Sequence, residues 1–219
     1  MQLVGTVTWR IGTDEPQSLL LALYVRDFSG LRPQVYPEVP PVEPAVLFGG
    51  RRSPVDGLAA AQWANWWRQL LDGGGFWPES LNPSDLSSIA HDPELQRLFY
   101  WPSRHAPPDF IGLSRAPELQ ALVRTQYEGA RSWSETRRSE FVALSSARQR
   151  LSLESEVVLT VERGLGRKAR PFELDIRVLP VTTVQAWRLA PGRALITRSL
   201  FRDRAAYRGW LRPVIEELA

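Results

Sequence analysis

The last third of the chain, residues 155–219, carries the pattern that most restricts the fold. In residues 172–178, four apolar residues alternate with three charged ones, the period of two that a strand with one buried face requires. Residues 157–162 alternate in a similar way. Gly164 and Gly166 lie between the two segments and permit the positive φ of a chain reversal. We therefore predict an antiparallel hairpin with its tip at residues 163–170.

A second hairpin and a closing helix are predicted after the first. The hairpin arms are residues 184–189 and 194–199, on either side of a Pro-Gly turn, and a tight register would place Trp187 on the same face as Ile196. The helix is indicated by apolar residues at intervals of three and four, namely Tyr207, Trp210, Leu211, Val214, Ile215 and Leu218. Pro213 predicts a kink or a break in that helix.

The N-terminal residues 1–28 are predicted to form another hairpin. Residues 3–11 alternate well enough for a strand, and residues 12–16 have the composition of a turn. The leucine-rich run at 18–27 fits a buried strand or a short helix, because periodicity cannot separate the two in so short an apolar run. We favour a strand that pairs with the first and joins the C-terminal sheet.

The middle of the chain is predicted to be a connector followed by helices. Residues 29–53 contain five prolines and should be extended, either as a stiff connector or as a proline-rich ligand for a partner. Residues 54–151 should form a helical insertion, which begins with a helix over 54–72. That helix carries Trp63, Trp66 and Trp67 on one face, which predicts either core packing or a partner interface.

Together these patterns predict a single α+β domain over residues 1–219. Its sheet would be mostly antiparallel and built from N-terminal and C-terminal hairpins, with the helical insertion and a C-terminal helix packed on one side. The predicted parts are the N-terminal hairpin, 1–28, the proline-rich connector, 29–53, the helical insertion, 54–151, and the C-terminal strands and helix, 152–219.

Composition excludes several classes of site. The chain has no cysteine, which rules out disulfides, thiolate metal sites and cysteine nucleophiles, and its two histidines are too few for most metal sites built on several imidazoles. Neither GxxxxGK[ST] nor GxGxxG occurs, so no cofactor is predicted. The longest apolar run, residues 19–25, is far shorter than the roughly 20 residues of a membrane span, and no secretory signal is evident. We expect a cytoplasmic protein with no membrane partner.

Charge is unevenly distributed and gives the main functional hypothesis. Residues 1–114 hold 8 Arg and 12 Asp+Glu, whereas residues 115–219 hold 19 Lys+Arg and 12 Asp+Glu. A basic half suggests an acidic partner. We predict a non-enzymatic interaction module that docks an acidic protein through its basic hairpin tip and its arginine-rich last helix. The predicted binding residues are Arg163, Arg167, Lys168, Arg170, Arg204 and Arg208.

Three alternatives remain open from the sequence. The same arginines could bind phosphates of a nucleic-acid backbone, and an anion could also bind before the first predicted helix, at Gly49, Gly50, Arg51, Arg52 and Ser53. A hydrolase-type enzyme could use His91 or His105 with nearby carboxylates such as Asp92 and Asp109, although we lean against an enzyme. The chain could instead be a structural subunit of an oligomer.

Overall fold

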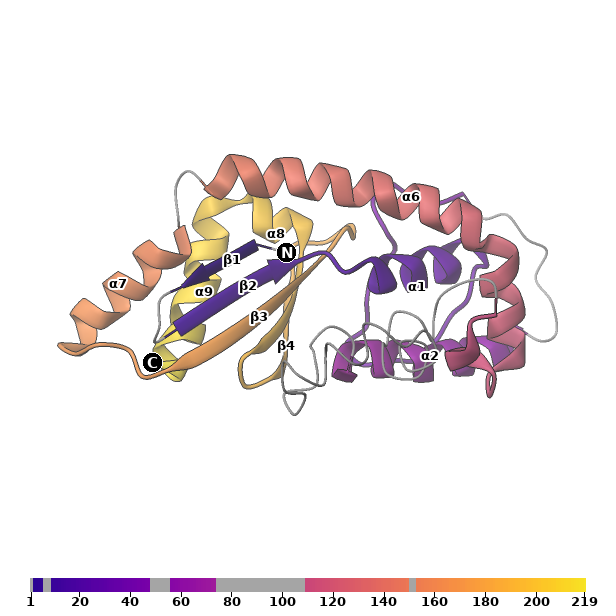
Figure 1. The fold of residues 1–219 in the computed structure, drawn as a ribbon, viewed down its shortest axis with the longest axis horizontal. Coiled ribbons are helices and arrows are strands. Elements are labelled where there is room, and N and C mark those ends of the chain that lie inside the picture. Colours follow the sequence, from indigo (N-terminus) through magenta and orange to yellow (C-terminus); the bar gives the residue numbers. More distant parts are fainter. Residues whose placement is uncertain (1, 6–8, 48–55, 74–108, 150–152) are drawn as a thin grey trace, which may run out of the picture. The chain divides into compact units, whose positions relative to one another are not determined.

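The computed structural model describes residues 2–5, 9–47, 56–73, 109–149 and 153–219 (Figure 1). The chain divides into two compact units, each assembled from separate segments. The first unit comprises Met1–Gln17, Val39–Ala45 and Ser134–Ala219, and the second comprises Ser18–Glu38 and Val46–Trp133. The single domain over residues 1–219 stays a prediction.

The first unit contains a mixed sheet of five strands in the order β1-β2-β3-β5-β4. The strands are β1 (Gln2–Gly5), β2 (Trp9–Asp14), β3 (Phe172–Leu179), β4 (Ala186–Ala190) and β5 (Arg193–Thr197). Strands β2 and β5 both run parallel to β3, while β1 and β4 are antiparallel to their neighbours at the edges. The α+β class is confirmed, but the prediction of a mostly antiparallel sheet is wrong.

Two segments predicted as strands are helices, which explains the error in the sheet. Residues 157–162 lie in α7 (Leu153–Leu165), and residues 18–27 lie in α1 (Gln17–Phe28). Since the expected antiparallel neighbour of β3 is absent, β3 pairs with strands reached by long connections, which permit parallel pairing. The predicted hairpin with its tip at 163–170 does not form. The N-terminal hairpin consists instead of β1 and β2, which together cover most of the segment expected to be one strand and part of the expected turn.

One face of the sheet packs on helices and holds the core of the first unit. On β2, Trp9 and Ile11 point to this face, and on β3 it is the alternate residues Phe172, Leu174, Ile176 and Val178. They pack with residues of α6 (Pro117–Gln149), α7, α8 (Arg198–Arg202) and α9 (Arg204–Leu218), among them Phe141, Val157, Val161, Phe201, Tyr207, Leu211 and Ile215. The predicted closing helix is therefore confirmed. It continues through Pro213 without a break.

The predicted second hairpin is also confirmed, with a different register. Trp187 pairs with Leu195, so these two residues share a face, and the register shifts between Arg188 and Ala190. Gly192 at the turn has φ of 71°, and its carbonyl accepts a hydrogen bond of 2.7 Å from the backbone N–H of Asp175. An irregularity of one residue moves every following side chain to the other face, and local patterning does not reveal it.

The proline-rich connector is held against the end of the sheet. Val42 forms an isolated bridge with Val181. The backbone N–H of Glu43 donates to the carbonyl of Pro180 over 2.7 Å, and that of Thr182 donates to Pro41 over 3.2 Å. Val42 is fully buried. These contacts fix residues 41–43 beside the strand-to-strand loop that follows β3.

The second unit is helical in the residues described. Its elements are α1, α2 (Asp56–Gly73), a short 3-10 helix (Ile111–Leu113) and the first half of α6. Trp63, Trp66 and Trp67 are all buried, and the rings of Trp63 and Trp67 stack with centroids 5.2 Å apart. The tryptophan face of α2 is therefore core. Among the described helices of either unit, none is both long and apolar enough to cross a membrane.

Candidate functional site

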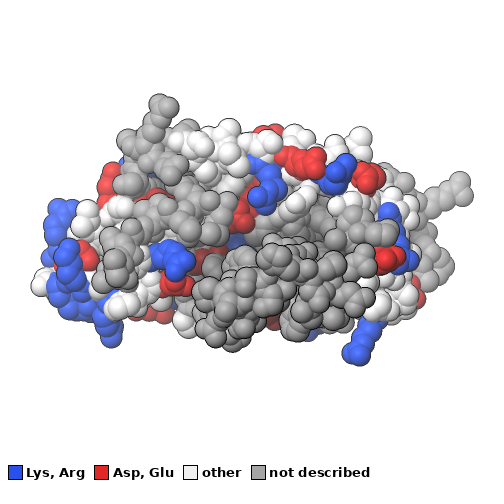
Figure 2. All heavy atoms as spheres, viewed as in Figure 1, with Lys and Arg blue, Asp and Glu red and all other residues white. Residues whose placement is uncertain are grey.

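The predicted basic residues lie at helix ends and in a loop, because the hairpin that was to carry them is absent. Arg163 is in the last turn of α7, while Arg167, Lys168 and Arg170 lie between α7 and β3. Arg204 and Arg208 are in the first two turns of α9. Figure 2 shows basic side chains gathered over the end of α7. The structure thus separates the six residues into two groups with different surroundings.

The loop group is engaged by groups of its own chain. Arg167 Nη1 and Arg170 Nε donate to the carbonyl oxygen of Ala219 over 2.9 Å and 3.2 Å. Lys168 Nζ lies 3.0 Å from Glu162 Oε2, and the N–H of Ala169 donates to the other oxygen of Glu162. The Ala169 hydrogen bond and then Lys168 lower the pKa of Glu162. The two arginines therefore satisfy the carbonyl at the C-terminal end of α9, where a positive charge also interacts favourably with the helix dipole.

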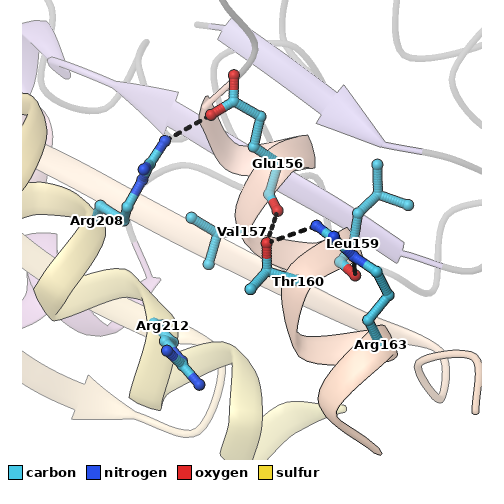
Figure 3. Close-up of a pocket in the computed structure, with 7 residues that line it drawn as sticks. All are labelled: Glu156, Val157, Leu159, Thr160, Arg163, Arg208 and Arg212. Atoms are coloured by element: carbon cyan, nitrogen blue, oxygen red, sulfur yellow. Dashed lines mark hydrogen bonds and ion pairs between the residues drawn. The ribbon is translucent and has the colours of Figure 1, made fainter. Parts of the chain in front are cut away.

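Two residues of the second group, Arg163 and Arg208, line a groove between α7 and α9 with a volume of about 520 Å³ (Figure 3). Its lining comes from these two helices alone and consists of Glu156, Val157, Leu159, Thr160, Arg163, Arg208 and Arg212. Three guanidinium groups therefore surround the groove against one carboxylate. Val157 is buried, whereas Leu159 is 51% exposed and adds an apolar wall.

The three groove arginines differ in their partners. Arg208 Nη2 lies 2.6 Å from Glu156 Oε2, and Arg212 Nε lies 2.8 Å from Glu216 Oε1. Arg163 instead donates to the carbonyl of Leu159 and to Thr160 Oγ1, each over 3.2 Å (Figure 3). In the part of the chain that the structure describes, no carboxylate pairs with Arg163. Among the described residues, its positive charge is therefore not neutralised by an ion pair.

The groove is suited to binding an anionic group. A guanidinium presents several N–H donors in a planar fork that matches carboxylate and phosphate oxygens. Arg163 uses two of these donors on neutral oxygens of α7, and the residue is exposed. The exposed side chain of Leu159 lies within the same lining and can contact carbon atoms of a ligand. This mixture of donors and apolar wall is typical of a recognition surface.

A second charged cluster lies where two parallel strands end. Glu15 follows β2 and Arg198 follows β5, and Arg198 Nη2 lies 2.6 Å from both carboxylate oxygens of Glu15. Arg198 Nη1 also donates to Glu140 Oε2 over 2.8 Å. Burial raises the pKa of Glu15 to about 7, against the opposing effect of Arg198. Such shifts occur at active sites and in structural ion pairs alike. With side chains only 0% and 7% exposed, this pair is closed to ligands.

The remaining candidate residues are only partly covered by the structure. Gly49, Gly50, Arg51, Arg52 and Ser53 lie outside the described residues, and so do His91, Asp92 and His105. Asp109 is described, and its carbonyl accepts hydrogen bonds from Gln120 and Arg124. Within the described segments, no group of three His, Asp or Glu side chains could hold a metal ion.

The sequence did not single out Glu156, Leu159, Thr160 or Arg212 as site residues. The first three were assigned to a strand or its flank, where they would alternate between two faces. As a helix, the segment places Glu156, Thr160 and Arg163 on one side, at intervals of four and three residues. This spacing of four and three residues is the feature of the sequence that could have indicated a shared helix face.

Comparison of the chain with protein-family models, with curated proteins and with solved structures finds no match in any of the three.

Proposed function

We propose that this protein is a binding module that docks an acidic segment of a partner protein in the groove between α7 and α9. The observation that carries the proposal is Arg163, whose charge meets no carboxylate among the described residues and which lies beside the exposed Leu159. A partner segment with a carboxylate next to an apolar side chain complements both features. The volume of about 520 Å³ suits a few side chains, so the segment should be short.

An acidic protein segment fits the lining better than a nucleic-acid backbone does. A nucleic-acid backbone is a continuous line of phosphates and is normally bound by a broad positive surface. The groove contains an apolar wall that phosphates cannot use. A protein segment in which acidic and apolar side chains alternate can contact both the arginines and the apolar wall of the groove. Phosphate binding is therefore kept as an outcome of the test.

The proposal is tested by removing the charge of Arg163. The probe is a fluorescein-labelled peptide of about 12 residues in which glutamate alternates with leucine, titrated with the protein by fluorescence anisotropy. We expect Arg163→Gln to weaken binding about 3-fold to 5-fold, since one exposed ion pair contributes up to about 1 kcal/mol. Binding by the wild-type protein should also weaken as salt is raised.

The matched control is Arg10→Gln, which removes one positive charge from the other face of the sheet, where Arg10 pairs with Glu173 over 2.8 Å. We expect the Kd of this variant for the peptide to be within about 2-fold of the wild-type value. A charge far from the groove has little effect on binding because salt screens it. Equal weakening by both variants would contradict the proposal. A labelled single-stranded oligonucleotide of the same charge is titrated in parallel, and tighter, Arg163-dependent binding of it would favour the phosphate alternative.

A further inference from the structure

The carboxylate of Glu156 contacts two arginines of α9. Its Oε2 is 2.6 Å from Arg208 Nη2, and both of its oxygens are 3.2 Å from Arg204 Nη2. The two arginines are one turn apart on α9, and the glutamate comes from α7 (Figure 3 shows the contact with Arg208). One carboxylate thus bridges two guanidinium groups at the mouth of the groove that Arg208 lines.

This bridge is exposed and therefore easy to exchange. The side chains of Glu156, Arg204 and Arg208 are 48%, 40% and 52% exposed. Exposed ion pairs of this kind contribute little to stability, because water screens them and long side chains lose entropy on pairing. A second carboxylate can replace Glu156 with little loss. Yet Glu156 is present at a high effective concentration, since it belongs to the same chain.

The bridge is not needed to attach α7 to the rest of the unit. The buried face of α7 includes Val157, Val158 and Val161, which pack in the core beneath the sheet. Full burial of one such side chain stabilises a fold more than an exposed ion pair does. Three of them outweigh one exposed bridge several times over. Removal of the Glu156 charge should therefore leave the helix in place.

We infer that Glu156 is a built-in competitor, which occupies the carboxylate-binding position on Arg204 and Arg208 and lowers the affinity of the groove for an acidic partner segment. This inference rests on the proposed function. Docking exchanges the carboxylate of Glu156 for one from the partner. The partner therefore needs two acidic positions, one for Arg163 and one for the Arg204 and Arg208 pair.

The experiment compares Glu156→Gln with Glu173→Gln in the full chain. Each substitution removes one negative charge, and Glu173 lies on the other face of the sheet, paired with Arg10. The probe is the same labelled glutamate-leucine peptide. We expect Glu156→Gln to tighten binding about 3-fold to 10-fold and Glu173→Gln to change it by less than about 2-fold. Adding Arg208→Gln to Glu156→Gln should abolish most of the gain.

Other results would overturn the inference. Equal tightening by both variants would mean that only net charge matters. Unchanged or weaker binding by Glu156→Gln would mean that Glu156 does not compete or that it positions the arginines. Wild-type binding that still depends on Arg163 would then leave the proposed function standing. If no peptide binding depends on Arg163, both the proposed function and the inference about Glu156 are wrong. Thermal unfolding of each variant shows whether the fold is retained.

Discussion

Glu15 is a buried carboxyl group whose ionisation is coupled to folding. Its carboxylate is buried beside Arg198, with Arg138 and Glu140 of α6 also acting on it. Burial disfavours the charged form and raises the pKa from 4.5 to about 7, although Arg198 and Arg138 oppose the rise. Removing one partner of such a pair leaves an unpaired buried charge, which is strongly destabilising.

We predict that stability decreases with pH between about 4.5 and 7 because of Glu15. Its pKa in the folded protein lies above the ordinary value of 4.5, so the folded state binds the proton more tightly than the unfolded chain does. The contribution is complete below pH 4.5 and is lost as pH rises through 7, and a shift of this size corresponds to about 3 kcal/mol at most. Urea unfolding across this range should show a flatter pH dependence for Glu15→Gln than for the wild type. Identical slopes would refute the assignment.

At the scale of elements, Trp63 connects two helices of the second unit. It belongs to α2, and its Nε1 donates to the carbonyl of Ala22 in α1 over 2.7 Å. The guanidinium of Arg26 lies 5.7 Å from the ring centroid on the α1 side, and Trp67 stacks on the ring from within α2. Burial of its ring, one hydrogen bond and contacts with two neighbouring side chains therefore all stabilise the position of Trp63.

We expect Trp63→Ala to destabilise the protein by about 3–5 kcal/mol, since it removes a fully buried indole and leaves a cavity. Trp63→Phe keeps an aromatic ring but leaves the Ala22 carbonyl without its donor, so a smaller loss of about 1–3 kcal/mol is expected. Denaturant unfolding followed by far-UV circular dichroism measures both, independently of tryptophan fluorescence. A Trp63→Ala variant within about 1 kcal/mol of the wild type would contradict the packing.

At the scale of the whole molecule, the first unit depends on segments from both ends of the chain. Strand β2 pairs with β3 along its full length, from Trp9 opposite Phe172 to Asp14 opposite Arg177. Trp9 and Ile11 are part of the same core as α7 and α9. Glu15 adds the buried contact with Arg198. Residues 134–219 therefore lack one side of their own sheet when taken alone.

We predict that a fragment of residues 134–219 does not fold cooperatively by itself. Without β2, the inner edge of β3 is unpaired and the apolar face of the sheet loses two large side chains. A synthetic peptide of residues 1–17 should restore structure when added in excess, because it supplies the missing strand and Glu15. Circular dichroism melts with and without the peptide measure this effect. A cooperative melt of the fragment alone would show that β2 is dispensable.

Local patterns in the sequence were sufficient for the elements whose signals are short-range. The apolar stripe of α9 and the Pro-Gly turn between β4 and β5 predicted both elements, and the three tryptophans of α2 predicted a buried face as one of two outcomes. Arg204 and Arg208 could be placed on one side of a helix from their spacing alone. Charge distribution likewise directed attention to the C-terminal half.

Only the tertiary structure decided the identity of α1 and α7 and the direction of the central strands. The apolar runs of α1 and α7 are short enough to be compatible with either a helix or a strand. Which of the two forms depends on how the run is buried against distant segments of the chain. Strand pairing joins residues more than a hundred positions apart, so no local window contains it. For the same reason the groove could not be predicted: Arg163 meets Arg208 and Arg212 only because α7 is a helix and packs beside α9.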